Sequence, residues 1–207
     1  SEAVDPSATL DIAPCSVEQA LTLERDLGVS FPVAQILVRR GVADVEAARQ
    51  FLAADEEHPA SAFHGIDAAV SALTSAAAAG ERITVHGDYD VDGVSSTAIL
   101  VRALRSIGAD VDWFLPSRTE DGYGLREPTI RRLAERGTRL LLATDCGITA
   151  VDETALAQEL GMRVVIVDHH TPRPDGVLPD APIVHPTVGG YPCADLCAAA
   201  VAWKLAG

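Results

Sequence analysis

Residues 83–93 read Ile-Thr-Val-His-Gly-Asp-Tyr-Asp-Val-Asp-Gly, and this stretch is the most informative feature of the chain. A short apolar run leads into His86 and then into three aspartates at every second position, Asp88, Asp90 and Asp92. If the backbone stays extended, these four side chains project to the same side, along one edge of a strand that leaves the sheet. Such crowded negative charge is unfavourable without a cation, and divalent ions bind carboxylate and imidazole ligands. The stretch therefore predicts half of a metal site.

Two further segments repeat this design. Residues 139–144 are largely apolar and lead into Asp145, and residues 163–167 are largely apolar and lead into Asp-His-His at 168–170. Short apolar runs between helical patterns are typical of buried parallel strands, whose carboxyl ends collect functional groups. A single aspartate at a strand end is most often the N-cap of the next helix. Three such ends, one with two adjacent histidines, favour a shared site.

Strand and helix patterns alternate regularly from residue 81 onward. We expect strands at 82–87, 110–116, 139–144, 163–167 and 182–185, and helices at 93–107, 128–136, 151–160 and from 198. This alternation predicts an α/β fold, a mainly parallel β-sheet flanked by helices.

The first third of the chain is predicted to be helical. Helices are expected at 16–27, 32–40, 45–53 and 66–79, and they carry no cluster of catalytic residue types. The predicted organisation is a flexible tail at 1–15, a helical N-terminal subdomain at 16–80 and the α/β domain at 81–207.

Composition limits the class of protein. The chain has 207 residues, 48% of them hydrophobic, which is enough for a substantial core. No apolar run approaches transmembrane length, no signal peptide is visible, and the four cysteines form no zinc-binding pattern. We therefore expect reduced cysteines and a cytoplasmic location.

The net charge of −14 argues against binding nucleic acid by electrostatics alone. Bound metal ions, or a basic surface elsewhere in a longer protein, would have to compensate for the acidic residues.

Three motifs together carry a family resemblance. Asp-Tyr-Asp-Val-Asp-Gly at 88–93, Thr-Asp-Cys-Gly-Ile-Thr at 144–149 and Asp-His-His at 168–170 resemble motifs I, II and III of the DHH phosphoesterase superfamily. Arg-Thr-Glu-Asp-Gly-Tyr-Gly-Leu at 118–125 is similar, more narrowly, to the RecJ family of bacterial single-stranded-DNA exonucleases. The resemblance runs from about residue 35 to the end of the chain.

The resemblance implies a two-metal phosphodiesterase, a 5′-to-3′ exonuclease that acts on single-stranded DNA in DNA repair and recombination. It implies two Mn²⁺ or Mg²⁺ ions per site, and the mixed imidazole and carboxylate ligands suit Mn²⁺ better. It also implies further domains, one of the DHHA1 type and one oligonucleotide-binding barrel, and a motif IV aspartate beyond Gly207. The isolated chain is therefore a candidate for an inactive fragment.

Two alternatives stay open. One is a DHH phosphoesterase acting on short oligonucleotides or cyclic dinucleotides, against which the stretch 118–125 argues. The other is a non-catalytic binding scaffold, which would show eroded motifs, whereas motifs I to III here keep their acidic and histidine positions.

The resemblance also implies a set of metal ligands. It places His86, Asp90 and Asp145 on one ion. It places Asp92, Asp145 and His169 on the other, so that Asp145 bridges the two.

Three further residues are expected to assist the reaction. Asp88 is expected in outer coordination, and Asp168 is expected to hydrogen-bond a histidine and fix its tautomer. His170 is the candidate for contacting the scissile phosphate or protonating the leaving oxygen.

Four residues are candidates for substrate contact. Arg118 would bind a phosphate, Tyr123 would stack on a base, and Ser95 and Ser96 open a helix whose first amides could receive a phosphate. The alternatives are a solvated arginine, a tyrosine packed beneath its loop and ordinary helix capping. His185, at a strand end, is predicted to be structural.

Overall fold

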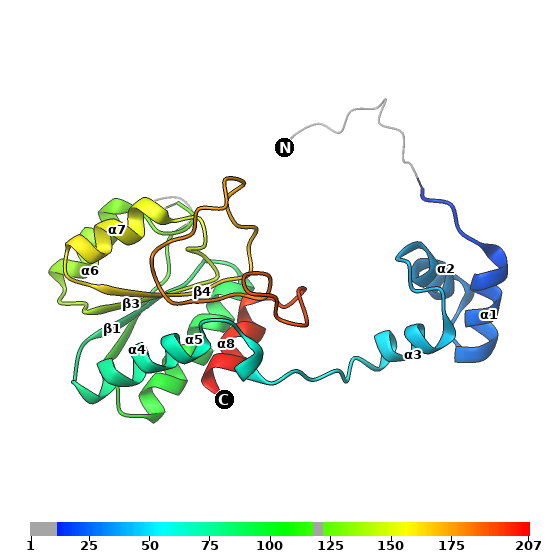
Figure 1. The fold of residues 1–207 in the computed structure, drawn as a ribbon, viewed down its shortest axis with the longest axis horizontal. Coiled ribbons are helices and arrows are strands. Elements are labelled where there is room, and N and C mark those ends of the chain that lie inside the picture. Colours follow the sequence, from blue (N-terminus) through cyan, green and yellow to red (C-terminus); the bar gives the residue numbers. More distant parts are fainter. Residues whose placement is uncertain (1–11, 118–121) are drawn as a thin grey trace. The chain divides into compact units, whose positions relative to one another are not determined.

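The structure, a computed structural model, describes residues 12–117 and 122–207 and divides between Glu57 and His58 into two compact units (Figure 1). The helix α4 (Ile66–Ala78), which the sequence analysis grouped with the N-terminal helices, lies in the second unit. It belongs there because one face of the helix packs into the core of that unit, through Ile66, Ala69, Leu73 and Ala76.

The first unit contains the helices α1 (Val17–Leu27), α2 (Phe31–Arg39) and α3 (Val45–Ala53). Ser16 and Asp44 begin α1 and α3 as N-caps, since their side chains accept hydrogen bonds from amides of the first turn. The core of this unit is small and consists of Ala20, Leu23, Ala34, Leu37 and Ala48.

The second unit is built on a parallel sheet of five strands in the order β2-β1-β3-β4-β5. The strands are β1 (Ile83–His86), β2 (Val111–Phe114), β3 (Leu140–Thr144), β4 (Arg163–Val167) and β5 (Ile183–Val184). The remaining helices are η1 (Ala60–Ala62), α5 (Val91–Ser106), α6 (Glu127–Glu135), α7 (Val151–Glu159) and α8 (Ala198–Ala206). The predicted α/β class with a parallel sheet is confirmed.

Helices cover both faces of this sheet (Figure 1). One face packs against α4, α5 and α8, and the other packs against α6 and α7. Alternate residues of β3 divide between the two cores, with Leu140 and Leu142 on the first side and Leu141 and Ala143 on the second. Burial on both faces explains why β3 and β4 read as nearly continuous apolar runs.

The strand order creates a crevice at the carboxyl ends of β1 and β3. The chain passes from β1 to β2 on one side and then returns to place β3 on the other side of β1. The connections that leave β1 and β3 therefore diverge, and ligands of open α/β sheets bind at the carboxyl ends of such strands.

The expectation of an extended backbone through Asp92 is wrong. β1 ends at His86, and α5 begins at Val91 with Asp90 as its N-cap. Asp90 Oδ1 accepts hydrogen bonds from the amides of Asp92 and Gly93, both at 2.9 Å. Because this side chain satisfies two amides of the first helical turn, the helix starts inside the acidic motif.

No helix in the described part of the chain has the length and apolar character needed to cross a membrane. All four cysteines are free thiols.

Gly93 lets the acidic loop fold back onto α5. A Cβ at this position would lie 2.5 Å from the carbonyl oxygen of Asp88, which is backbone and cannot move aside as a side chain would. We expect Gly93→Ala to lower the free energy of unfolding by about 1–3 kcal/mol, although alanine is normally the better helix former by about 1 kcal/mol. Urea denaturation measures this. Val94→Ala, at an exposed position of the same helix, is the neutral control, and a Gly93→Ala protein as stable as wild type would contradict the prediction.

Candidate metal centre

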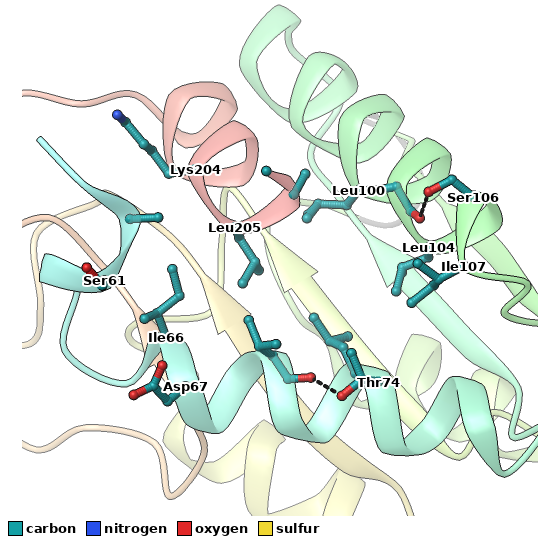
Figure 2. Close-up of a pocket in the computed structure, with 16 residues that line it drawn as sticks. Ser61, Ile66, Asp67, Thr74, Leu100, Leu104, Ser106, Ile107, Lys204 and Leu205 are labelled. Atoms are coloured by element: carbon teal, nitrogen blue, oxygen red, sulfur yellow. Dashed lines mark hydrogen bonds between the residues drawn. The ribbon is translucent and has the colours of Figure 1, made fainter. Parts of the chain in front are cut away.

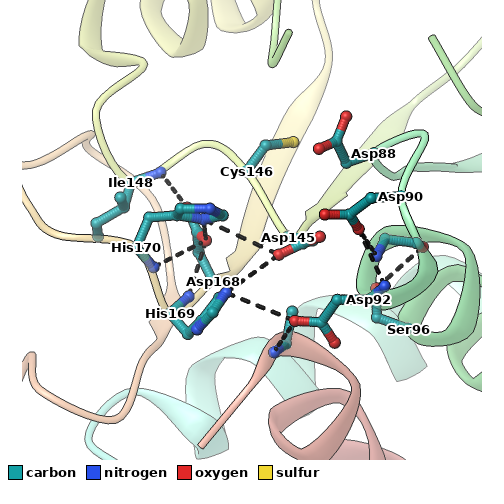
Figure 3. A network of polar contacts seen from close by, with 12 residues as sticks. Asp88, Asp90, Asp92, Ser96, Asp145, Cys146, Ile148, Asp168, His169 and His170 are labelled. Carbon is teal, nitrogen blue, oxygen red and sulfur yellow. Dashed lines mark hydrogen bonds and ion pairs between the residues drawn. The ribbon is translucent and has the colours of Figure 1, made fainter. Parts of the chain in front are cut away.

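Acidic and imidazole side chains converge at the carboxyl ends of β1, β3 and β4 (Figure 3). The loop after β1 brings Asp88 and Asp90, β3 leads directly into Asp145, and β4 leads into the Asp-His-His segment at 168–170. The site therefore lies at the crevice that the strand order creates.

Asp145 occupies the centre of this cluster. Its backbone φ is +59°, a left-handed conformation that non-glycine residues adopt mainly under a functional or structural constraint. Its side chain is only 2% exposed, and Oδ1 lies 3.3 Å from His169 Nε2. Among the described residues, Oδ1 accepts no hydrogen bond that meets normal geometry, so a buried carboxylate oxygen is left for another partner.

Two groups of donor atoms share Asp145. Its carboxylate and the ring nitrogens of His169 and His170 lie within 4.8 Å of one another, and so do carboxylate oxygens of Asp88, Asp90 and Asp145. Carboxylate and imidazole donors at this spacing fit divalent cations. The buried oxygen without a hydrogen bond and the two donor groups therefore fit a pair of ions that share Asp145.

Burial and the negative charge of the cluster change the pKa of Asp145. Burial, followed by the nearby charges of Asp92 and Asp90, raises this pKa to about 7. The pKa of Asp90 is lowered, mainly because its carboxylate accepts the hydrogen bond from the Gly93 amide. One proton near neutral pH thus partly neutralises the cluster, a role that a cation would take over.

Asp92 reaches the cluster from the first turn of α5. Its Oδ2 lies 3.5 Å from His169 Nε2. The same carboxylate accepts hydrogen bonds from the amides of Ala198 at 2.8 Å and Ala199 at 2.7 Å, at the start of α8.

Asp168 holds the two histidines in place. It is fully buried, and its Oδ1 lies 2.8 Å from His170 Nδ1 and accepts a hydrogen bond from the His169 amide at 2.8 Å. Its Oδ2 accepts from the Ile148 amide at 2.9 Å. Burial opposes the charge of Asp168, but the hydrogen bond with His170 and the one from Ile148 outweigh it and lower the pKa of this carboxyl. The bond with Asp168 in turn raises the pKa of His170.

Tyr123 contacts His170 from the loop before α6. Its hydroxyl lies 3.3 Å from each ring nitrogen of His170, and the two rings meet edge to face. The hydroxyl also donates to the backbone oxygen of Asp145 at 3.5 Å. Tyr123 is 47% exposed, and its stacking on a base stays a prediction.

Three other predicted site residues, His86, Ser95 and Ser96, belong to neither donor group. His86 is buried, with Nδ1 3.7 Å from Cys146 Sγ, and neither donor group found among the described residues includes it. Ser96 is buried and donates to the backbone oxygen of Gly93, whereas Ser95 is half-buried. Arg118 lies outside the described residues.

His185 supports the backbone of the Asp-His-His segment. This buried histidine donates from Nε2 to the backbone oxygen of His170 at 2.8 Å, while Nδ1 accepts from the amides of Thr187 and Val188. Burial lowers the pKa of His185, which keeps the ring neutral. The neutral ring with its proton on Nε2 can donate to His170 and accept at Nδ1 at the same time. Its place at a strand end before Pro186 was the available signal.

Two of the hollows in the second unit differ in their position relative to the metal centre. One, of about 470 Å³, is lined by Tyr123, Asp168 and His170 together with the start of α7, and it adjoins the metal centre. The other, of about 440 Å³, lies between α4, α5 and α8 (Figure 2). Its walls are mainly leucine, isoleucine and alanine, and Asp67 and Lys204 are its charged side chains. The hollow beside His170 is therefore the one placed for chemistry.

The raised pKa of Asp145 predicts a pH-dependent stability. A carboxyl whose pKa is higher in the folded than in the unfolded protein stabilises the fold when protonated, and this contribution is lost as the pH rises through the folded value. With the folded pKa at about 7, metal-free protein should lose at most about 4 kcal/mol of unfolding free energy between about pH 4 and pH 7. Urea denaturation in EDTA measures this. Asp145→Asn, which tolerates the left-handed backbone, should lack this part of the pH dependence, and identical profiles for the two proteins would contradict the assignment.

Comparison with known proteins agrees with this geometry. Residues 82–207 match the DHH family, N-terminal domain. The chain is 39% identical over 194 residues to the single-stranded-DNA-specific exonuclease RecJ of Bacillus subtilis, which covers 91% of this chain and 24% of that protein. The chain thus spans about a quarter of the length of this curated relative.

Solved structures give the same result. A crystal structure of exonuclease RecJ bound to manganese matches with a TM-score of 0.65 and 40% identity, covering 70% of this chain and 37% of that one. The structure of Thermus thermophilus RecJ in complex with Mn²⁺ matches with a TM-score of 0.65 and 32% identity, covering 95% of this chain and 27% of that one. With the parallel sheet, the shared aspartate and the Asp-His-His segment in place, the chain belongs to the DHH family.

Proposed function

We propose that this chain is the catalytic part of a metal-dependent exonuclease that shortens single-stranded DNA from its 5′ end. The observation that carries the proposal is the buried Asp145 carboxylate, which two donor groups share at the crevice of the sheet. The similarity to RecJ exonucleases supports the substrate, since it extends over 91% of the chain, beyond the residues matched by the DHH family.

The donor set is the part of the site that would hold metal. Asp88, which the sequence pattern placed in outer coordination, would join Asp90 and Asp145 on one ion. Asp145 with His169 would bind the other ion, with Asp92 beside them. We retain His86, which is buried, as a proposed ligand of the first ion. Bound Mn²⁺ or Mg²⁺ would neutralise the phosphodiester and lower the pKa of an attacking water.

The residues of the chain itself supply the remaining chemistry. Asp168 orients the His170 ring, and its hydrogen bond favours the protonated imidazole near neutral pH. A protonated His170 in the hollow beside the metal centre is suited to donate a proton to the leaving oxygen of the DNA. Tyr123 holds the same ring from the opposite loop, and its partly exposed side chain would stack on a base.

The proposal also concerns the rest of the protein. With a net charge of −14, this chain needs bound cations and a basic surface on further domains to retain a polyanion. We propose domains of the DHHA1 and oligonucleotide-binding types, a motif IV aspartate that completes the metal centre, and action in the cytoplasm on intermediates of DNA repair and recombination.

The first test uses the protein at its natural length with Mn²⁺. The substrates are a 3′-labelled, 5′-phosphorylated single strand and the matching duplex. We expect progressive shortening of the single strand only, and loss of this activity in Asp145→Ala because the shared ligand is removed. Cleavage of dinucleotides and cyclic dinucleotides without degradation of the long strand would replace the proposal with a phosphoesterase for short substrates. Metal binding without any cleavage would favour the scaffold.

His170→Asn separates the proton donor from the metal ligands. If His170 acts as the acid, the turnover number should fall by about 10²- to 10⁴-fold, while the Mn²⁺ affinity measured by calorimetry stays near that of wild type. His169→Asn is the control and should weaken Mn²⁺ binding. If His170→Asn loses Mn²⁺ to the same extent, His170 is a ligand and the acid must be sought elsewhere.

A further inference from the structure

The helix α8 is capped by a residue from a distant part of the chain. Its own N-cap, Cys197, makes no side-chain capping bond. Asp92 takes this role, since its Oδ2 accepts from the Ala198 amide at 2.8 Å and its Oδ1 accepts from the Ala199 amide at 2.7 Å (Figure 3). Two of the amides that every helix leaves unpaired at its start are thus satisfied by a carboxylate of the acidic motif.

The same carboxylate faces the metal centre. Asp92 Oδ2 lies 3.5 Å from His169 Nε2, which itself lies 3.3 Å from Asp145 Oδ1. An ionised carboxylate offers about four lone-pair sites, so the two amide bonds leave each oxygen able to bind a cation as well. Asp92 therefore stands between the start of α8 on one side and the metal donors on the other.

Packing holds the two helices in this relation. Leu100 and Val101 of α5 and Val201 and Ala202 of α8 are buried in one core. A carboxylate that is fixed by two amides on a packed helix cannot rotate away from the cluster without breaking both bonds. Its orientation is set before any ion binds.

We propose that the backbone amides of Ala198 and Ala199 position Asp92 for the metal ion, so that the seating of α8 and the metal affinity are coupled. The inference rests on the proposed metal centre but does not depend on the polymer that the protein cleaves. Hydrogen-bond partners of metal ligands commonly change metal affinity by about 10- to 100-fold. The coupling is reciprocal, so that bound metal also stabilises the start of α8.

Proline substitutions in the first turn of α8 test this inference. Ala199→Pro removes one amide that binds Asp92, whereas Ala200→Pro removes a neighbouring amide that does not. The two positions are matched, because both are half-buried, both follow a helical residue and both lie in the turn where proline is tolerated best. Calorimetric titration with Mn²⁺ should give a dissociation constant raised about 10-fold or more for Ala199→Pro and unchanged for Ala200→Pro. Circular dichroism checks that both proteins are folded.

A folded Ala199→Pro protein with wild-type Mn²⁺ affinity would overturn the inference, and so would an equal loss in Ala200→Pro. If the proline variants do not fold, titration of the ¹⁵N-labelled wild-type chain with Mg²⁺ gives the answer. The amide resonances of Ala198 and Ala199 should shift with the metal concentration and that of Ala200 much less, and unmoved resonances would overturn the coupling. Wild-type protein that binds Mn²⁺ but leaves single-stranded DNA intact would overturn the exonuclease and leave this inference standing.

Discussion

The main constraint on the second unit is that five carboxylates lie close together at the carboxyl ends of its strands. Most of them are anchored by main-chain amides. Asp88 accepts from the Tyr89 amide, Asp90 from the start of α5, Asp92 from the start of α8 and Asp168 from Ile148 and His169. Within residues 12–117 and 122–207, Asp145 Oδ1 is the carboxylate oxygen of this cluster that is buried without a hydrogen bond. Because it is surrounded by like charge, it is the oxygen with most to gain from a cation.

The supporting layers explain why such a cluster is stable in the folded protein. Apolar cores on both faces of the sheet fix the ends of β1, β3 and β4 relative to one another. Asp168 and Tyr123 then hold the His170 ring, and His185 holds its backbone. His170 is thus held by hydrogen bonds on several sides, and such support is usual for a precise metal site.

The proposed metal ions would explain how such an acidic chain can act on a polyanion. Without cations, the cluster and the net charge of −14 would repel a polyanion. Bound divalent ions reverse the sign of the local field where the phosphodiester would lie. The proposed function therefore needs the metal ions for the approach of the substrate as well as for its cleavage.

The parallel α/β fold could be predicted from the sequence alone, since apolar runs such as 140–144 must be buried on both faces of a sheet. The sequence also predicted that Asp145, His169 and the acidic motif meet at the carboxyl ends of the strands. Periodicity could not show whether Asp90 continues the strand or caps a helix, because the choice depends on hydrogen bonds to amides that form only when the chain turns. Nor could it place α4 in the larger unit, because an apolar helix face does not by itself show which core it packs against. Only in the folded chain does Asp92 meet the amide of Ala198, and only there is Asp145 Oδ1 buried without a hydrogen bond from the described residues. Both features depend on residues that are far apart in the chain, so they leave no local pattern in the sequence.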